Sequence, residues 1–161
     1  MKYCIKLSLW FLLFITNAVI ADDQIIKELD ATWAELARTV MEGDFEGYKK
    51  GYHQDAILVS GFSKDSYPIA KALAGWKSGF DDTKAKKMTA GVDFHFTQRL
   101  HDKTTAHETG MFRYYTTDKQ GKHAEFIAHM NALLIKKEGK WLIMMEYQKS
   151  KMTREQWDAL K

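Results

Sequence analysis

The fold of this chain depends most on one stretch near its C-terminal end, HAEFIAHMNALLIKKEGKWLIMMEYQKS, at residues 123–150. Two apolar segments, 123–137 and 140–150, flank the dipeptide Glu138-Gly139, which suits a two-residue hairpin loop. The second segment reads as a strand, and the first fits a long strand or, as the less favoured alternative, a helix. We therefore predict an antiparallel hairpin with long arms.

A two-residue loop also determines which side chains share a face of this hairpin. Lys137 then lies opposite Lys140, and successive side chains alternate between the two faces. One face carries apolar pairs and a single phenol, namely Leu134 with Ile143, Ala132 with Met145 and Met130 with Tyr147. The other face is apolar near the turn, and further along it carries four polar residues in one cross-strand neighbourhood: His129, Asn131, Glu146 and Gln148.

Further strands are expected before this hairpin. Apolar and polar residues alternate over 92–97, residues 104–117 are rich in threonine and aromatic side chains, and 56–59 is a short apolar run. Residues 118–121 are typical of a turn. A four-residue loop there pairs Thr117 with Lys122. It places Gly110, Phe112 and Tyr114 on the face of His129, whereas a loop one residue longer or shorter places Met111, Arg113 and Tyr115 there instead.

Helical patterns dominate the first half of the chain. Residues 22–42 repeat apolar side chains at three- and four-residue spacing, which is typical of an amphipathic helix, and Gly43-Asp44 ends it. Shorter helices are expected at 45–52, 67–80 and 153–160, the last with Thr153 as its N-cap. Helices first and antiparallel strands last indicate an α+β domain, with the helices packed on one face of a curved antiparallel sheet.

The first 21 residues have the pattern of a secretory signal peptide. Lys2 and Lys6 precede an apolar run at 7–15, and short side chains precede a cleavage point after Ala21. A spanning helix needs roughly 20 apolar residues, so an uncleaved membrane anchor is the less favoured alternative. We expect residues 1–21 to be removed and residues 22–161 to form one periplasmic or secreted domain that is no longer attached to a membrane.

Removal of this segment also changes the composition that bears on function. The whole chain has 161 residues, one cysteine and a formal net charge of +3. Cys4, Lys2 and Lys6 all lie in the signal segment, so the mature domain is nearly neutral and contains no cysteine. This composition excludes a disulfide framework and a multi-cysteine zinc site. It also gives no basic surplus for binding nucleic acid.

Several short motifs together resemble one superfamily. They are Trp33, the break Gly43-Asp44-Phe45, the strand entry His53-Gln54-Asp55-Ala56, the sequence AHETG at 106–110 and KEGKWLI at 137–143. Their order and spacing resemble the nuclear transport factor 2-like (NTF2-like) superfamily, and within it the SnoaL-like and DUF4440-type domains, over about residues 22–150. The resemblance implies a cone, in which the sheet curls around the long helix and leaves a pocket, and it implies homodimers through the outer sheet face. Members include isomerases, dehydratases, cyclases and binding domains, so the fold does not decide the function.

One class within the superfamily is disfavoured by two positions. Ketosteroid-isomerase-like enzymes place a tyrosine seven residues before the Gly-Asp break, where this chain has Leu36. They place an aspartate base five residues after the aspartate of the strand entry, where this chain has Ser60. The oxyanion donor and the carboxylate base of that chemistry are therefore both missing from their expected positions.

The polar residues of the last hairpin are the main chemical candidates. By the resemblance, the positions matching His129 and Asn131 often point into the cone. A partly buried Glu146 would have a raised pKa and could act as a base, with His129 as acid, base or orienting donor. The alternatives are hydrogen bonds across the sheet or a solvated dimer face. Aromatic residues at helical spacing more often form the core than a ligand site, and Tyr48 and Tyr52 are the better candidates because a buried hydroxyl needs a partner. The candidate ligand-binding residues are Trp33, Tyr48, Tyr52, Trp76, His129, Asn131, Glu146 and Gln148.

Three functions follow as hypotheses. The first is an exported domain that binds a small, mostly apolar molecule in its cone-shaped pocket. The second is a non-catalytic dimeric interaction module, and the third is a lyase or isomerase that uses Glu146 and His129. The six histidines show no compact ligand spacing, and no glycine-rich phosphate loop or GxGxxG motif occurs. We therefore expect no metal and no cofactor, and we expect neither nucleic acid nor a membrane as partner.

Overall fold

The structure is a computed structural model that describes residues 8–160, with side chains described from residue 23 onward. The helices are α1 (Ser8–Glu42), α2 (Phe45–Lys50), α3 (Ile69–Lys84) and α4 (Arg154–Asp158). The strands are β1 (Tyr52–Ser60), β2 (Asp65–Pro68), β3 (Met88–His101), β4 (Thr105–Asp118), β5 (His123–Lys137) and β6 (Lys140–Lys151). The expected signal segment lies outside the residues whose side chains are described, and its cleavage after Ala21 stays a prediction. Within the described part of the chain, no helix has both the length and the apolar character needed to cross a membrane.

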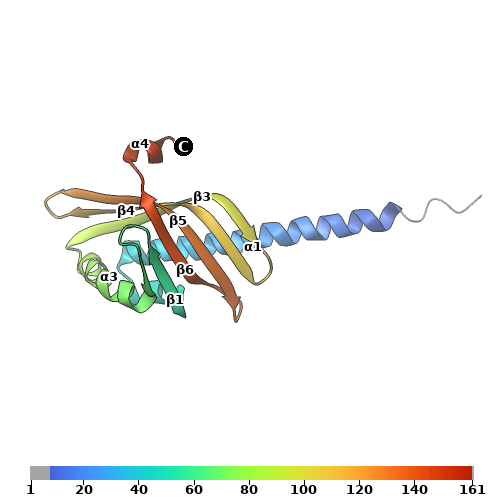
Figure 1. Cartoon of the computed structure of the whole chain (residues 1–161), viewed down its shortest axis with the longest axis horizontal. Coiled ribbons are helices and arrows are strands. Elements are labelled where there is room, and N and C mark those ends of the chain that lie inside the picture. Colours follow the sequence, from blue (N-terminus) through green and yellow to red (C-terminus); the bar gives the residue numbers. More distant parts are fainter. Residues whose placement is uncertain (1–7, 161) are drawn as a thin grey trace, which may run out of the picture.

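One six-stranded sheet, in the order β2-β1-β6-β5-β4-β3, curls around the C-terminal part of α1 (Figure 1). Helix α1 packs mainly against β3, and α3 packs against β1. The predicted α+β architecture, with helices on a curved sheet, is confirmed. The sheet is mixed and not purely antiparallel, because β1 and β6 run parallel. No hairpin signal could indicate this pair, since most of the domain separates the two strands in the sequence.

The apolar stripe of α1 and the concave face of the sheet form the main core. Leu29, Trp33 and Leu36 follow each other at three- and four-residue spacing and are all buried. They pack in one cluster with Leu134 of β5 and Ile143 of β6, which are fully buried. The helical stripe and the hairpin face that carries the apolar pairs such as Leu134 with Ile143, both predicted from the sequence, therefore meet each other in the structure.

Two element boundaries differ from the sequence prediction, and each has a local cause. Helix α2 ends at Lys50, so Tyr52 begins β1 instead of closing a helix. Tyr67 and Pro68 belong to β2, and α3 begins only at Ile69. A residue that precedes proline avoids the helical region of backbone space. Pro68 itself is the N-cap, with an extended backbone at φ −56° and ψ 140°.

The register of the last hairpin agrees with the prediction near the turn and then departs from it. Lys137 pairs with Lys140, and Leu134 pairs with Ile143, as predicted. A β-bulge then inserts Met144 as an extra residue in β6, so that Glu146 pairs with Ala132 and not with Asn131. A second irregularity at Lys149 pairs His129 with Ser150. Because a shift of one residue moves a side chain to the other face, the predicted grouping of His129, Asn131, Glu146 and Gln148 on one face is wrong.

The β4–β5 hairpin uses the longer of the loops considered from the sequence. Thr117 pairs with His123, which leaves five residues between them. Met111 consequently lies opposite His129, whereas Phe112 and Tyr114 share the other face with Met130. The second of the two open registers is therefore the one found, and it turns Phe112 and Tyr114 toward the inside of the cone.

Candidate functional site

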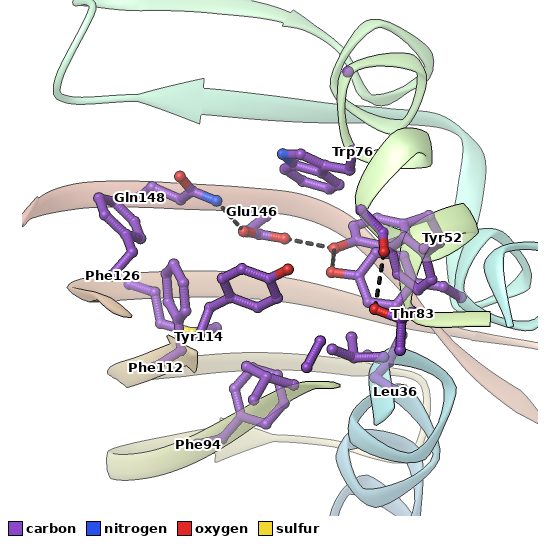
Figure 2. Close-up of a pocket in the computed structure, with 18 of the residues that line it drawn as sticks. Leu36, Tyr52, Trp76, Thr83, Phe94, Phe112, Tyr114, Phe126, Glu146 and Gln148 are labelled. Carbon is purple, nitrogen blue, oxygen red and sulfur yellow. Dashed lines mark hydrogen bonds between the residues drawn. The ribbon is translucent and has the colours of Figure 1, made fainter. Parts of the chain in front are cut away.

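A cavity of about 390 Å³ lies between α1, α3 and the concave face of the sheet (Figure 2). Nine aromatic side chains from both helices and strands form most of its wall: Trp33, Tyr48, Tyr52, Trp76, Phe80, Phe94, Phe112, Tyr114 and Phe126. Ligand-binding cavities in proteins commonly have volumes of roughly 300–1,000 Å³ and mostly apolar walls with a few polar groups. This cavity has both properties.

Two glycines of α3 help to leave this space open. Gly75 and Gly79 both line the cavity and lie four residues apart, on the same side of the helix. A Cβ atom added to Gly75 would have no atom within 4 Å, and one added to Gly79 would lie 3.6 Å from the Tyr114 hydroxyl oxygen. Glycine inside a helix costs roughly 0.5–1 kcal/mol relative to alanine. Here the two glycines leave space at the cavity that larger side chains would occupy.

Four polar side chains of the cavity form one chain of hydrogen bonds. The Tyr52 hydroxyl donates to Glu146 Oε2 at 2.6 Å, and the Gln148 side-chain amide donates to Glu146 Oε1 at 2.8 Å. The Tyr48 and Tyr52 hydroxyls lie 3.1 Å apart. Figure 2 shows this chain running from Gln148 through the Glu146 carboxyl group to Tyr52. Each oxygen of Glu146 thus accepts one hydrogen bond from a neutral donor.

Burial controls the protonation of these groups. Removal from water raises the pKa of Glu146, and the hydrogen bonds from Tyr52 and Gln148 oppose this rise only in part. Burial and the nearby Glu146 raise the pKa of Tyr48 and of Tyr52 well above the ordinary value. Burial also raises the pKa of Tyr114. The phenols therefore stay neutral at physiological pH, and Glu146 is the group whose charge can change.

A second buried carboxylate lies close to the cavity wall and has a different role. Glu108 is fully buried and accepts hydrogen bonds from the Trp33 indole and from the Arg99 guanidinium, each at 2.5 Å. Arg99 also pairs with Asp30 of α1 at 2.5 Å. Glu108 thus has a cation as partner and fixes the Trp33 ring in the cavity wall. It does not line the cavity itself.

The structure brings together six of the eight candidate ligand-binding residues and separates the other two. Those that line the cavity are Trp33, Tyr48, Tyr52, Trp76, Glu146 and Gln148. Asn131 lies on the outer face, where its amide donates to Thr109 Oγ1 at 2.7 Å. His129 lies on the same outer face, with its Nδ1 3.2 Å from the Ser150 hydroxyl oxygen. Glu146 and His129 therefore lie on opposite faces of the sheet and cannot act on one bound molecule.

Several cavity residues were not among the candidates. Phe112 and Tyr114 belong to this group, because the open register of the β4–β5 hairpin left their face undecided. Gly75 and Gly79 belong to it as well, and the signal that could have indicated them is their four-residue spacing on one side of an apolar helix. Among the described residues, no cluster of three or more His, Cys, Asp or Glu side chains could hold a metal ion.

Solved structures with the same fold come from several bacteria. A conserved protein from Planctomyces limnophilus matches with a TM-score of 0.65 and 9% identity, over 78% of this chain and 95% of its own. A ketosteroid isomerase-like protein from Erwinia carotovora matches with a TM-score of 0.58 and 14% identity, over 79% of this chain and 95% of its own. An NTF2-like superfamily protein from Salmonella enterica matches with a TM-score of 0.60 and 8% identity, over 83% of this chain and 96% of its own.

These matches show that the chain has the NTF2-like fold, as the sequence motifs predicted. Identities this low carry no information on what is bound or catalysed. No family model matches the chain, and no curated protein matches it in sequence.

Proposed function

We propose that this protein binds a small, mostly apolar molecule in the aromatic cavity, with a polar group of that molecule placed against Glu146 and Gln148. One observation carries the proposal: a cavity of about 390 Å³ joins aromatic walls to a hydrogen-bonded chain of polar side chains centred on the buried Glu146. Aromatic rings supply apolar contact area, and a few fixed polar groups supply orientation. The arrangement is that of a ligand site more than that of a filled core.

The space beside α3 supports the same proposal. Glycine at two cavity-facing helical positions lowers helix stability, and a larger side chain at either position would reduce the volume. A chain selected only for stability would gain from alanine or leucine there. The proposal therefore makes Gly79 a position at which stability and ligand binding change in opposite directions.

N-phenyl-1-naphthylamine, a neutral dye that emits strongly in apolar surroundings, tests the proposal. We expect saturable binding to the wild-type domain. Gly79→Leu should weaken it by about tenfold or more, equivalent to about 1.4 kcal/mol, because the new side chain occupies the cavity. The matched control is Ala74→Leu, which adds the same side chain at an exposed position of α3 outside the cavity and should bind the dye as the wild type does. Absence of saturable binding to the wild type, or equal binding by Gly79→Leu, contradicts the proposal.

The catalytic hypothesis loses its original pair of residues. Because His129 lies on the outer face, a lyase or isomerase using Glu146 and His129 together is not compatible with the sheet register. A proton-transfer role would have to involve Glu146 and the phenols of Tyr52 and Tyr48, which are connected by hydrogen bonds. The binding proposal does not require that role.

The export and assembly of the protein are also proposed. We infer from the sequence that residues 1–21 are a signal peptide and that the mature protein, a SnoaL-like or DUF4440-type domain, is periplasmic or secreted. The mass of the protein from the extracytoplasmic fraction should correspond to a chain that begins at Asp22, and a full-length mass there would contradict this.

We further propose a homodimer through the outer sheet face, where Ile57 and Leu133 are exposed. Sedimentation showing only monomer would exclude it, and a dimer that binds no dye would favour an interaction module.

A further inference from the structure

Glu146 differs from the other buried acid of the domain in the kind of partner it has. Its side chain lies at the cavity wall, and the residue is 8% exposed. Glu108 is paired with Arg99, whereas in the described part of the chain Glu146 forms no ion pair with lysine, arginine or histidine. Acidic side chains are almost never fully buried unless they are paired. The cavity therefore contains a buried carboxyl group that has no cationic partner among the described residues.

The carboxyl group also has acceptor capacity that its protein partners do not use. An ionised carboxylate has about four lone-pair sites, and Glu146 uses one on each oxygen, for Tyr52 and for Gln148. Both donors are neutral, so neither compensates the charge. The remaining sites are available to a donor inside the cavity.

The walls around this carboxyl group favour positive charge as well. The faces of tryptophan, tyrosine and phenylalanine rings attract cations, and Figure 2 shows Trp76, Tyr52 and Tyr114 around the Glu146 carboxyl group. Among the described residues that line the cavity there is no lysine, arginine or histidine. An anionic molecule would therefore meet a carboxylate and aromatic faces with no compensating charge.

We propose that the cavity selects an organic cation, a protonated amine on an apolar or aromatic body, with the ammonium group donating to Glu146 between the surrounding aromatic rings. This inference rests on the proposed function and specifies the class of molecule. The titratable groups that face Glu146 across the cavity are Tyr48 on α2, Tyr52 on β1 and Tyr114 on β4, and all three are neutral at physiological pH. Among the described residues that line the cavity, Glu146 is therefore the group that can carry a negative charge in this range, and an ammonium group beside it would favour its ionised form.

Three naphthalene compounds of nearly the same shape test the charge preference by titration calorimetry at pH 7.5. They are 2-naphthylmethylamine as the cation, 2-naphthalenemethanol as the neutral compound and 2-naphthoate as the anion. A hydrogen bond to a charged group contributes roughly 1.5–3 kcal/mol, so the amine should bind about ten- to a hundredfold more tightly than the alcohol. The anion should bind more weakly than both.

The Glu146→Gln variant tests whether the preference for the amine over the alcohol depends on this residue. Glutamine keeps the shape of the side chain and an oxygen for Tyr52 but removes the charge, so the amine should lose its advantage while the alcohol still binds. Retained binding of the alcohol shows that the variant is folded. The matched control is Glu46→Gln, which removes the same charge from an exposed position of α2 and should keep the preference for the amine.

The outcomes separate this inference from the proposed function. If none of the three compounds binds to the wild type and the dye fails as well, the proposed function is wrong. If the alcohol binds at least as tightly as the amine, or if Glu146→Gln keeps the preference, the selection of a cation is overturned while binding of apolar molecules stands.

Discussion

The hydroxyl group of Tyr52 donates a hydrogen bond of 2.6 Å to Glu146 and thereby joins the parallel strands β1 and β6 at the cavity wall. Both residues are buried, and the Tyr48 hydroxyl lies 3.1 Å from that of Tyr52. The Tyr52 phenol on β1 thus connects two groups from two other elements, the Tyr48 hydroxyl on α2 and the Glu146 carboxyl group on β6. The stability of the domain and the chemistry of its cavity are coupled at this position.

Replacement of Tyr52 by phenylalanine should lower the free energy of unfolding by about 1–3 kcal/mol. The substitution leaves Glu146 Oε2 buried without its donor and deprives Tyr48 of its partner. Urea denaturation measures the loss. Tyr48→Phe is the matched control, because it removes one phenol–phenol contact and leaves the bond to Glu146 intact, so its loss should be smaller. Equal losses of free energy of unfolding in Tyr52→Phe and Tyr48→Phe would show that the hydrogen bond to Glu146 adds no stability beyond the phenol–phenol contact.

The raised pKa of Glu146 predicts how stability changes with pH. In the folded state this carboxyl group holds its proton to a higher pH than in the unfolded chain. Its contribution is therefore fully present below the unfolded pKa and is lost as the pH rises through the folded pKa, by about 1.4 kcal/mol for each unit of the shift. Glu146→Gln removes this titration, and Tyr48, Tyr52 and Tyr114 do not ionise in the range concerned.

Urea denaturation at a series of pH values between 4 and 8 measures the difference between wild type and Glu146→Gln. The variant should gain stability relative to the wild type as the pH rises, and the exposed Glu46→Gln should show no such trend. A difference between wild type and Glu146→Gln that stays constant over this range would mean that burial does not raise the pKa of Glu146.

The two acids that share Arg99 should differ strongly in their contribution to stability. Glu108 is fully buried, whereas the side chain of Asp30 is 59% exposed. Breaking a buried ion pair by removing one partner costs about 3–5 kcal/mol, and an exposed pair contributes about 0–1 kcal/mol. Glu108→Ala should therefore be much less stable than Asp30→Ala in urea denaturation. It should also change the fluorescence of Trp33, whose indole loses its acceptor. Similar losses for the two variants would contradict this assignment.

How far the sequence predicts the site depends on how well each local pattern determines a register. The turn at Glu138-Gly139, where both residues have positive φ, gives the four nearest pairs of the β5–β6 hairpin correctly. The bulge at Met144 falls in the uniformly apolar run 142–145. Because this run has no alternation of polar and apolar residues, it does not indicate which residue is extra. The sequence therefore predicts Glu146 as a pocket residue correctly but does not predict which residues share its face.

Other departures have equally local causes. Tyr52 shares helical spacing with Tyr48 and Phe45, yet the chain leaves the helix at Gly51, and β1 gains its partner β6 from far along the sequence. In the β4–β5 loop, the Asp118 carboxylate accepts hydrogen bonds from the backbone of Gln120 and Lys122, which stabilises the five-residue form. Side-chain hydrogen bonds of this kind determine the length of the loop, and the residue types in the loop do not by themselves predict it.

The short helix α4 lies on the outer face of the sheet and should be separable from the cavity. Thr153 is its N-cap as predicted, and the Thr153 side chain accepts from the Gln156 backbone while the Gln156 side chain accepts from the Thr153 backbone. Trp157 is buried against Met111 and Ile127. Trp157→Ala removes this contact, and a substitution of this kind in a core costs up to about 3–5 kcal/mol.

We expect α4 to detach before the sheet unfolds, so the loss should appear as faster trypsin cleavage after Lys151 and Arg154. The rate should rise by about a hundredfold for each 2.8 kcal/mol of lost docking energy when opening is in equilibrium. Thr153→Ala should have a smaller effect, since an N-cap contributes about 1 kcal/mol. Both variants should bind N-phenyl-1-naphthylamine as the wild type does, because the cavity lies on the concave face. Unchanged cleavage of Trp157→Ala would show that α4 is held by other contacts, and a loss of dye binding would show that the outer face supports the cavity.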